Sequence, residues 1–323
     1  MRSNKLVSIA MCTYNGERFL KEQLDSILSQ SYTNLELIIT DDCSSDKTIK
    51  ILEQYQKIDT RIKIYQNEEN LGFSKNFEKA ISLCNGEYIA LSDQDDIWKK
   101  NKIEKFLLEI KDNVLIYSDA ILIDKKATEL DKNLLQPKNR LVSGRCNKSF
   151  FFVNSISGNT LMFKKELTKY ILPIPKEMSF HDIWIGFVAS TYGTITFTQE
   201  SMTYYRRYQE QVTSHQNLIH KNLIDKLLYR KKEKLIVNNI LIKDLKSFRS
   251  CTLLKDTETI NIIDEIIDHL KNYENTYFNF KLYKLLKKHT DEIFAGYRLN
   301  KIKRRAFRIS VGLKLKIITF YRI

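Results

Sequence analysis

Proline and glycine are both scarce in this sequence, with three prolines and nine glycines in 323 residues. Such a composition argues against long flexible linkers. Cysteine is sparse as well. The five cysteines are scattered and include no CxxC pair, which argues against a disulfide framework and against a zinc site. The sequence therefore fits a reducing compartment.

Long hydrophobic runs and glycine-rich phosphate loops are also missing. No stretch reaches the roughly 18–20 apolar residues of a membrane-spanning helix, and the apolar run near the start is too short for a signal peptide. We therefore expect a cytoplasmic location. Neither GxGxxG after the first apolar run nor GxxxxGK(S/T) occurs, which disfavours dinucleotide and P-loop binding.

Negative charge is in the minority. The chain has 53 Lys and Arg against 39 Asp and Glu, a net charge of +14 at pH 7. This balance favours polyanionic partners, namely nucleic acid, anionic lipid or a phosphate-bearing substrate, although a lysine-rich background composition also contributes. No nucleic-acid recognition motif occurs, so we expect no nucleic-acid partner.

One acidic stretch stands out from this positive background. Residues 88–98 read YIALSDQDDIW, and the apolar run 88–91 has the length of a buried strand. Asp93, Asp95 and Asp96 follow it, and carboxylates this close repel one another. A hard divalent cation shared with substrate phosphates would offset the repulsion. The alternative is a solvated acidic turn that caps the next helix.

Apolar runs alternate with helical patterns in the first part of the chain. The strand-like runs 6–11, 35–39 and 62–65 are separated by helical spacing, which predicts parallel βαβ units in a doubly wound sheet. Ligands bind at the carboxyl edge of such a sheet. We expect two acidic clusters, Asp41 with Asp42 and Asp93 to Asp96, to converge on one cleft with the turn Thr13, Tyr14 and Asn15.

Four segments in order carry a family resemblance. They read VSIAMCTYNGERFL (7–20), LELIITDDCSSDKT (35–48), NLGFSKNFEKAI (70–81) and GEYIALSDQDDIW (86–98). Together they resemble the nucleotide-binding half of the family 2 inverting glycosyltransferases. The resemblance implies the GT-A fold, a doubly wound, mostly parallel, Rossmann-like α/β sheet. The family usually shows proline where this chain has Cys12.

The resemblance implies a donor site for a nucleotide-diphosphate sugar. Asp95 is the expected ligand of Mn²⁺ or Mg²⁺, and Asp93 is expected beside it, nearer the ribose and phosphate. Asp41 or Asp42 would hydrogen-bond the base, and the pattern does not decide between them. The other residues that the resemblance assigns to the donor are Thr13, Tyr14, Asn15, Glu17, Asn76, Gln94 and Arg206.

The acceptor side is expected in the second half of the fold. Residues 180–184 read FHDIW and resemble the segment that carries the family's catalytic base. Asp182 would accept the proton of the attacking hydroxyl, or it only N-caps a helix. His181 would orient or contact the acceptor. The remaining candidates for the acceptor wall are Trp184 and the turn formed by Gly158, Asn159 and Thr160. The alternative is that these three residues form an ordinary turn without a role in binding.

A basic segment follows the last expected strand. Residues 205–212 read YRRYQEQV and resemble a motif of rhamnosyltransferase-like members. Arg206 would clamp the diphosphate, or it belongs to a solvated edge strand. Tyr208 stands where histidine is common. The irregular stretch 125–148 is predicted to be a loop.

Residues 215–323 differ in composition from the rest of the chain. Leu and Ile are interleaved with Lys at helical spacing, and no acidic residue follows Glu292. We expect a catalytic domain at 1–214, with a donor half at 1–98 and an acceptor half at 99–214. The C-terminal helical appendage would lie on an anionic membrane surface. Alternatively it would pack on the catalytic domain or form a homodimer.

The sequence thus predicts a metal-dependent inverting glycosyltransferase. The donor candidates are dTDP-rhamnose and, as the alternative, a UDP-hexose or UDP-GlcNAc. The expected acceptor is a glycan or lipid-linked glycan of bacterial surface polysaccharide synthesis, met at the inner face of the plasma membrane. Less favoured alternatives are a basic nucleic-acid-binding protein and an inactive sugar-binding relative.

Overall fold

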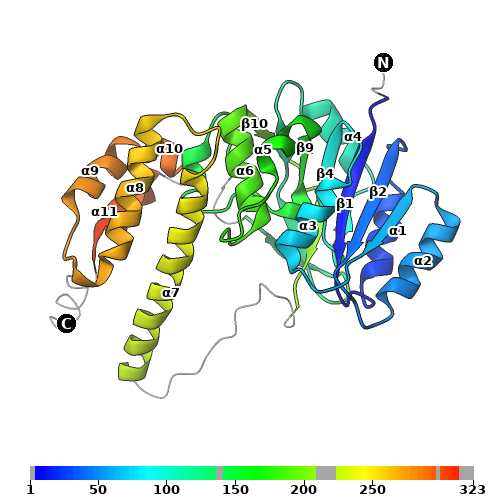
Figure 1. Ribbon diagram of the computed structural model, residues 1–323, viewed down its shortest axis with the longest axis horizontal. Helices are drawn as coiled ribbons and strands as arrows, with labels where there is room; N and C mark the ends of the chain where they lie inside the picture. Colours follow the sequence, from blue (N-terminus) through cyan, green and yellow to red (C-terminus); the bar gives the residue numbers. More distant parts are fainter. Residues whose placement is uncertain (1–3, 136–140, 209–222, 296–298, 313–323) are drawn as a thin grey trace. The chain divides into compact units, whose positions relative to one another are not determined.

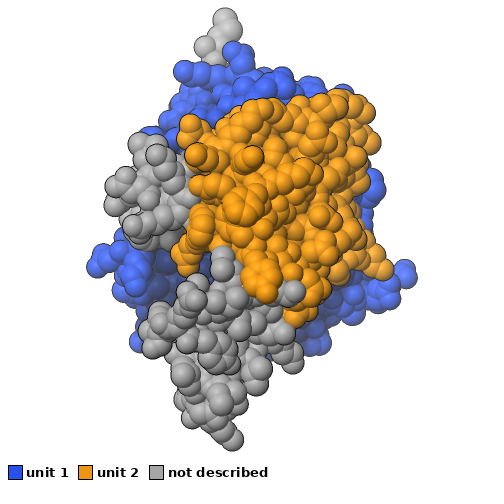
Figure 2. Space-filling model, turned by 90° about the vertical axis from the view of Figure 1, so that its left-hand side faces the viewer, with its two compact units in different colours: residues 1–147, 154–174, 180–208 blue, residues 148–153, 175–179, 209–323 orange. Residues whose placement is uncertain are grey.

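The computed structural model describes residues 4–135, 141–208, 223–295 and 299–312. The chain forms two compact units, which Figure 2 shows in different colours. Unit 1 comprises residues 1–147, 154–174 and 180–208, and unit 2 comprises residues 148–153, 175–179 and 209–323. The domain boundary expected after residue 214 lies outside the described residues.

Unit 1 contains two sheets (Figure 1). The larger has the order β10-β6-β9-β4-β1-β2-β3, and β9 runs antiparallel to both of its neighbours while the other pairs are parallel. The smaller has the order β5-β11-β7-β8. The strands are β1 Val7–Thr13, β2 Leu35–Asp41, β3 Ile62–Gln66, β4 Tyr88–Ser92, β5 Ile97–Trp98, β6 Leu115–Tyr117, β7 Ala120–Ile123, β8 Glu129–Asn133, β9 Leu161–Lys164, β10 Ile195–Phe197 and β11 Thr203–Arg206.

The helices of unit 1 alternate with the first strands. Residues of β1 and β2 pack in one core cluster against the apolar faces of α1, α2 and α4. In α1 that face consists of Leu20, Leu24 and Ile27, at helical spacing. The helices are α1 Leu20–Leu28, α2 Thr48–Ile58, α3 Phe73–Ser82, α4 Lys102–Glu109, α5 Thr168–Ile171 and α6 His181–Tyr192, with short 3₁₀ turns at η2 Gly158–Thr160 and η3 Lys165–Leu167.

The burial of the central strands explains why the alternation of apolar runs with helical patterns predicted the fold. Every residue of β2 and β4 is buried, as expected for parallel strands covered on both faces. The predicted mixed α/β fold with a mostly parallel sheet is therefore confirmed.

One local expectation and one alternative interpretation were wrong. The stretch 125–148 is not a plain loop, because β8 lies within it and pairs with β7. The acidic turn after β4 does not cap a helix. Residues Ile97 and Trp98 form β5, and α4 begins only at Lys102 after Asn101, without a side-chain cap. The pairing partner of β5 is β11, about a hundred residues further on, so local sequence could not indicate it.

The described part of unit 2 is mostly helical, as the sequence predicted. Its helices are α7 Leu223–Arg249, α8 Thr257–Lys271, α9 Phe280–Lys288, α10 Thr290–Ile293 and α11 Leu299–Ser310, with a 3₁₀ turn at η4 Tyr273–Asn275. The basic tail 313–323 lies outside the described residues. Among the helices that are described, none combines the length and the apolarity that a membrane crossing requires.

A buried carboxylate ties together three strands of the larger sheet. Glu36 in β2 accepts hydrogen bonds from the Ser8 hydroxyl (2.5 Å), the Asn85 backbone N–H (2.6 Å) and the Lys63 ammonium (2.9 Å). Burial pushes the pKa of Glu36 up, but these hydrogen bonds and the charge of Lys63 outweigh it and hold the pKa below its ordinary value. Glu36 is thus stabilising in its charged form.

We expect Glu36→Gln to destabilise the protein at pH 7 by about 1–3 kcal/mol, because an amide cannot replace all three interactions. With a lowered folded pKa, the stabilisation by Glu36 is present above the unfolded pKa of about 4.3 and is lost as pH falls through the folded value. The variant should therefore lose less stability than the wild type on acidification. Urea unfolding at several pH values measures both effects, and the exposed Glu53→Gln is the control.

Candidate functional site

Three carboxylates follow β4, and each has a different environment. Asp96 is fully buried, and it accepts hydrogen bonds from the Asn159 amide and from the backbone N–H of Arg206 (3.0 Å). Asp95 accepts a hydrogen bond from the Tyr208 hydroxyl (2.7 Å). The half-buried Asp93 makes no side-chain hydrogen bond to the described residues.

Negative charge accumulates at this sheet edge. Burial raises the pKa of Asp93 to about 7, with further contributions from the charges of Asp95 and Asp182, while Lys102 opposes the shift. Burial also raises the pKa of Asp96 well above its usual value, together with repulsion from Asp95 and Asp93. An arrangement that makes several carboxylates hard to ionise is more typical of a functional site than of a stabilising one.

Lys102 in α4 is a site residue that sequence reasoning missed. Its side chain is fully buried, and its ammonium donates to the Asn159 carbonyl (2.6 Å) and the Thr203 hydroxyl (3.1 Å). It also lies 3.5 Å from the centre of the Trp98 ring. In the sequence it looks like an ordinary surface lysine of an amphipathic helix, since its partners come from η2 and β11.

Asp182 lies in the first turn of α6, and its carboxylate is held by backbone groups. It accepts from the N–H of Ile183 (2.7 Å) and of Gly158 (3.2 Å). Burial raises the pKa of Asp182 to about 6, and these hydrogen bonds partly offset the shift. The helix cap is Phe180, without a side-chain cap bond, so Asp182 is not the N-cap that one interpretation suggested.

His181 and Gly158 are in close contact beside Asp182. A Cβ on Gly158 would come within 2.8 Å of the His181 Nε2, so the approach requires glycine. The His181 ring stacks on Phe77 with centroids 4.1 Å apart, and burial lowers its pKa to about 3. His181 is therefore neutral and packs against the turn that positions Asp182, and its contact with the acceptor stays a prediction.

The turn after β1 meets the acidic stretch through Gln94. The Gln94 amide accepts from the Tyr14 N–H (2.8 Å) and donates to the Tyr14 carbonyl (2.9 Å). A Cβ on Gly16 would lie 2.2 Å from the Gln94 Oε1, so this clamp depends on glycine. Tyr14, Asn15 and Glu17 are exposed on this turn. The convergence expected for the turn and the acidic stretch is thus present in unit 1.

The two aspartates at the end of β2 both hold loops. Asp41 accepts from the Thr13 hydroxyl (2.7 Å) and from the hydroxyl (2.6 Å) and N–H (2.9 Å) of Ser44. Asp42 accepts from the N–H groups of Leu71 (2.8 Å) and Gly72 (2.9 Å). Both carboxylates line the same edge, so base reading by either one stays a prediction.

Several expected contact residues lie inside the fold. Asn76 is buried and donates to the Thr40 carbonyl (2.9 Å). Trp184 is buried, and its indole N–H donates to the Ile171 carbonyl (2.8 Å). Asn159 and Thr160 are buried in η2 behind the acidic stretch. The polar side-chain groups of Asn76, Trp184 and Thr160 bond to the protein, whereas the Asn159 Oδ1 has no partner among the described residues. Contacts of these residues with a donor or an acceptor stay predictions.

Arg206 is not on a solvated edge, since its side chain has no exposed surface. Its guanidinium donates to the Asp95 carbonyl (2.8 Å) and pairs with Glu22 (2.8 Å). It also donates to the carbonyls of Asp124 and Lys125, both at 3.2 Å. Arg206 therefore anchors the acidic stretch, and the expected clamp on a diphosphate stays a prediction.

A divalent cation can be tested against these residues. Within the described ranges, no group of three His, Cys, Asp or Glu side chains could hold a metal ion. Mg²⁺, however, is usually bound through one or two carboxylates together with substrate phosphates. Asp93 has a raised pKa and no side-chain hydrogen bond in the described part of the chain. Asp93 and the nearby Asp95 therefore fit a cation whose remaining ligands are phosphate oxygens.

We expect Arg206→Lys to destabilise the protein by about 2–4 kcal/mol, because one ammonium cannot reach all the groups that the guanidinium bonds. The neighbouring Arg207→Lys is the matched control and should change stability by less than about 0.5 kcal/mol. Thermal and urea unfolding measure both. Unchanged stability of Arg206→Lys, with loss of nucleotide binding, would instead support a direct clamp.

Comparisons with known proteins agree with this geometry. The glycosyl transferase family 2 profile matches residues 8–171. An uncharacterized glycosyltransferase of Haemophilus influenzae is 30% identical over 264 residues, which are 79% of this chain and 81% of that protein. The dTDP-rhamnosyl transferase RfbG of Shigella flexneri is 30% identical over 217 residues, which are 62% of this chain and 73% of RfbG. For two further relatives the match spans only 54% and 38% of their length.

Among solved structures, S. aureus TarS 1–349 in complex with UDP superposes with a TM-score of 0.59. The alignment covers 98% of this chain and 91% of that one at 17% identity, so it bears on the fold alone. The family profile covers half of the sequence, and the Haemophilus relative is matched over most of its length. The chain therefore belongs to glycosyl transferase family 2.

Proposed function

We propose that this chain transfers a sugar from a nucleotide-diphosphate donor to a hydroxyl of a glycan acceptor, with inversion at the anomeric carbon. The main support is the clustering of Asp93 and Asp96 with Asp182, which is distant from them in sequence, and all three have raised pKa values. Like charges at one sheet edge are unfavourable for stability. A cation and a diphosphate would make the same arrangement favourable.

In this proposal Asp182 is the general base. The acceptor oxygen forms a bond to the anomeric carbon as the bond to the diphosphate breaks on the opposite face, and the hydroxyl proton passes to the Asp182 carboxylate. The N–H groups of Ile183 and Gly158 fix the carboxylate's orientation. A pKa of about 6 leaves it ionised at neutral pH and more basic than an ordinary carboxylate.

Asp93 and Asp95 are proposed to hold Mn²⁺ or Mg²⁺. The ion would neutralise charge on the departing diphosphate. The protein's part is to hold the stretch 93–96 in place, which Asn159 and Arg206 do through Asp96, and Tyr208 does through Asp95. Burial and the nearby Asp95 carboxylate raise the pKa of Tyr208, so it stays a donor.

The donor is proposed to carry a pyrimidine base. The Shigella relative is named a dTDP-rhamnosyl transferase, and the TarS structure contains UDP. Thymine and uracil share the ring N–H that Asp41 or Asp42 could accept. dTDP-rhamnose and UDP-hexose or UDP-GlcNAc donors both meet this requirement.

The acceptor is proposed to be a glycan or lipid-linked glycan in the synthesis of a bacterial surface polysaccharide. A lipid-linked acceptor would be met at the membrane. The basic C-terminal region would favour peripheral attachment to an anionic leaflet. In its described part, α11 carries Arg305 and Arg308 beside the half-exposed Phe307.

Asp182→Asn should lower the rate of transfer by about 10²–10⁴-fold, since the amide cannot accept the proton. In the wild type, activity should fall as pH drops below about 6, because Asp182 becomes protonated. Rates measured by nucleotide release with acceptor, from pH 5 to 8, test both. The exposed Asp112→Asn is the control. Full activity of Asp182→Asn would contradict the assignment.

UDP-glucose, UDP-GlcNAc and dTDP-rhamnose are the donors to compare, with CDP-glucose as the control because cytosine has no ring N–H. With Mn²⁺ present, a donor with uracil or thymine should raise the melting temperature by mass action, and CDP-glucose should not. EDTA should abolish the shift, and Asp95→Ala should lose it at any metal concentration. A shift of the same size in EDTA would exclude a metal requirement for donor binding.

A further inference from the structure

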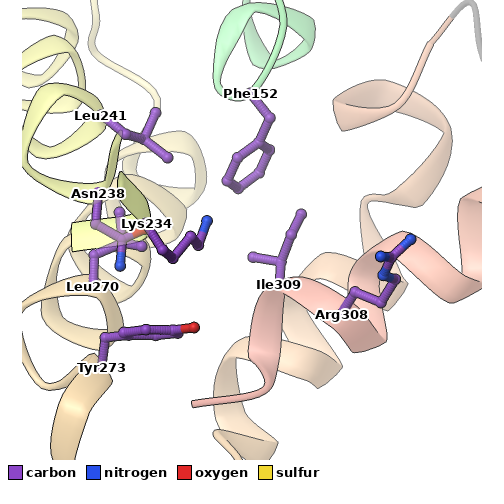
Figure 3. Close-up of a pocket in the computed structure, with 8 residues that line it drawn as sticks. All are labelled: Phe152, Lys234, Asn238, Leu241, Leu270, Tyr273, Arg308 and Ile309. Carbon is purple, nitrogen blue, oxygen red and sulfur yellow. The ribbon is translucent and has the colours of Figure 1, made fainter. Parts of the chain in front are cut away.

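Unit 2 contains a cavity of about 330 Å³ that no part of the proposed transfer uses. Figure 3 shows its walls, with the rings of Phe152 and Tyr273 on opposite sides and the Lys234 ammonium between them. The size is at the lower end of the range of small-molecule sites, which is roughly 300–1,000 Å³. Its lining comes from three helices, one 3₁₀ turn and one loop: Lys234, Asn238, Leu241, Leu270, Tyr273, Arg308, Ile309 and Phe152.

Helix α7 presents polar residues to this cavity from a face that is otherwise apolar. Lys234, Asn238 and Leu241 are spaced by four and three residues, which places them on one side of a helix. The same spacing continues to Leu245 and Phe248, which are completely buried core residues. Lys234 is exposed, whereas leucine at the buried position 238 would extend that core, so stability alone does not account for Asn238.

Asn238 is the more unusual of the two. Its side chain is 2% exposed, and neither its amide nitrogen nor its oxygen has a hydrogen-bond partner among the described residues. Leaving a buried polar group unsatisfied is destabilising. Asparagine supplies both donors and an acceptor, and a ligand hydroxyl, which also donates and accepts, can satisfy both ends.

The charge around the cavity has one sign. Lys234 and Arg308 line it, and none of the eight lining residues is acidic. Two acids of unit 2 pair with cations that do not line the cavity, Glu265 with Lys281 and Glu292 with Lys148. The remaining walls are aromatic or aliphatic. Such a cavity favours an anion that also has a flat or apolar face.

We propose that this cavity binds an anionic saccharide, a sugar that carries a phosphate or a carboxylate. The Asn238 amide would bond its hydroxyls, Lys234 and Arg308 its charge, and Phe152 and Tyr273 the C–H face of its ring. The site consists of unit 2 residues alone, so it does not depend on the transfer chemistry proposed for unit 1.

Binding can be measured on the full chain in EDTA with isotope-labelled methyl groups. Glucose 1-phosphate should shift the methyl resonances of Ile309, Leu241 and Leu270 saturably, whereas glucose and inorganic phosphate should bind at least tenfold more weakly. Glucuronate in place of glucose 1-phosphate separates a carboxylate from a phosphate preference. Equal binding of inorganic phosphate alone, or no shift of the Ile309 methyl with either anionic sugar, would overturn the proposal.

Variants complete the test. Asn238→Leu and Arg308→Gln should each weaken glucose 1-phosphate binding about tenfold, and Asp182→Asn should leave it unchanged. The control is Lys246→Gln, which removes one charge from the exposed side of the same helix. Arg308 is exposed, so its variant should keep the wild-type melting temperature. Unchanged binding by both cavity variants would show that the sugar binds elsewhere.

Discussion

Burial of negative charge at the carboxyl end of β4 is the constraint on which unit 1 depends. Asp96 is completely buried and would be too costly there without donors. Its donors are Asn159 and the backbone of Arg206, which lie 63 and 110 residues further along the chain. The acidic stretch can therefore adopt this conformation only when η2 and β11 are in place. The smaller sheet supports the site, because its strand β11 contains Arg206, whose backbone N–H bonds Asp96.

Two completely buried basic side chains lie beside this charge without cancelling it. Lys102 and Arg206 direct most of their described hydrogen bonds to backbone carbonyls and a hydroxyl. They fix the loops around the acids, and the pKa of Asp93 stays raised to about 7. A residual negative field thus remains at the sheet edge. In the proposed function that field would attract a cation, and the cation in turn a diphosphate.

The sequence predicts the parts of this arrangement that depend on local pattern. The strands β1, β2 and β4 are short apolar runs followed by polar residues, and their order along the chain implies a shared edge. The burial of Lys102, Arg206 and Trp184 could not be predicted. Whether a long polar side chain is buried depends on partners from distant strands, and Lys102 bonds groups 57 and 101 residues away. For the same reason β5 could not be predicted, because its pairing partner is the distant strand β11.

This edge is assembled by side chains where other nucleotide-binding folds use a glycine-rich loop. Gln94 clamps the turn after β1, and Asp42 orders the turn before α3. A carboxylate only accepts hydrogen bonds. In the proposed function, the one of Asp41 and Asp42 that meets the base would therefore receive an N–H from it, in addition to the bonds that already fix the loop. Uracil and thymine offer such a group, whereas cytosine has no ring N–H. The fixed conformation of the loops and the choice of base would then depend on the same two side chains.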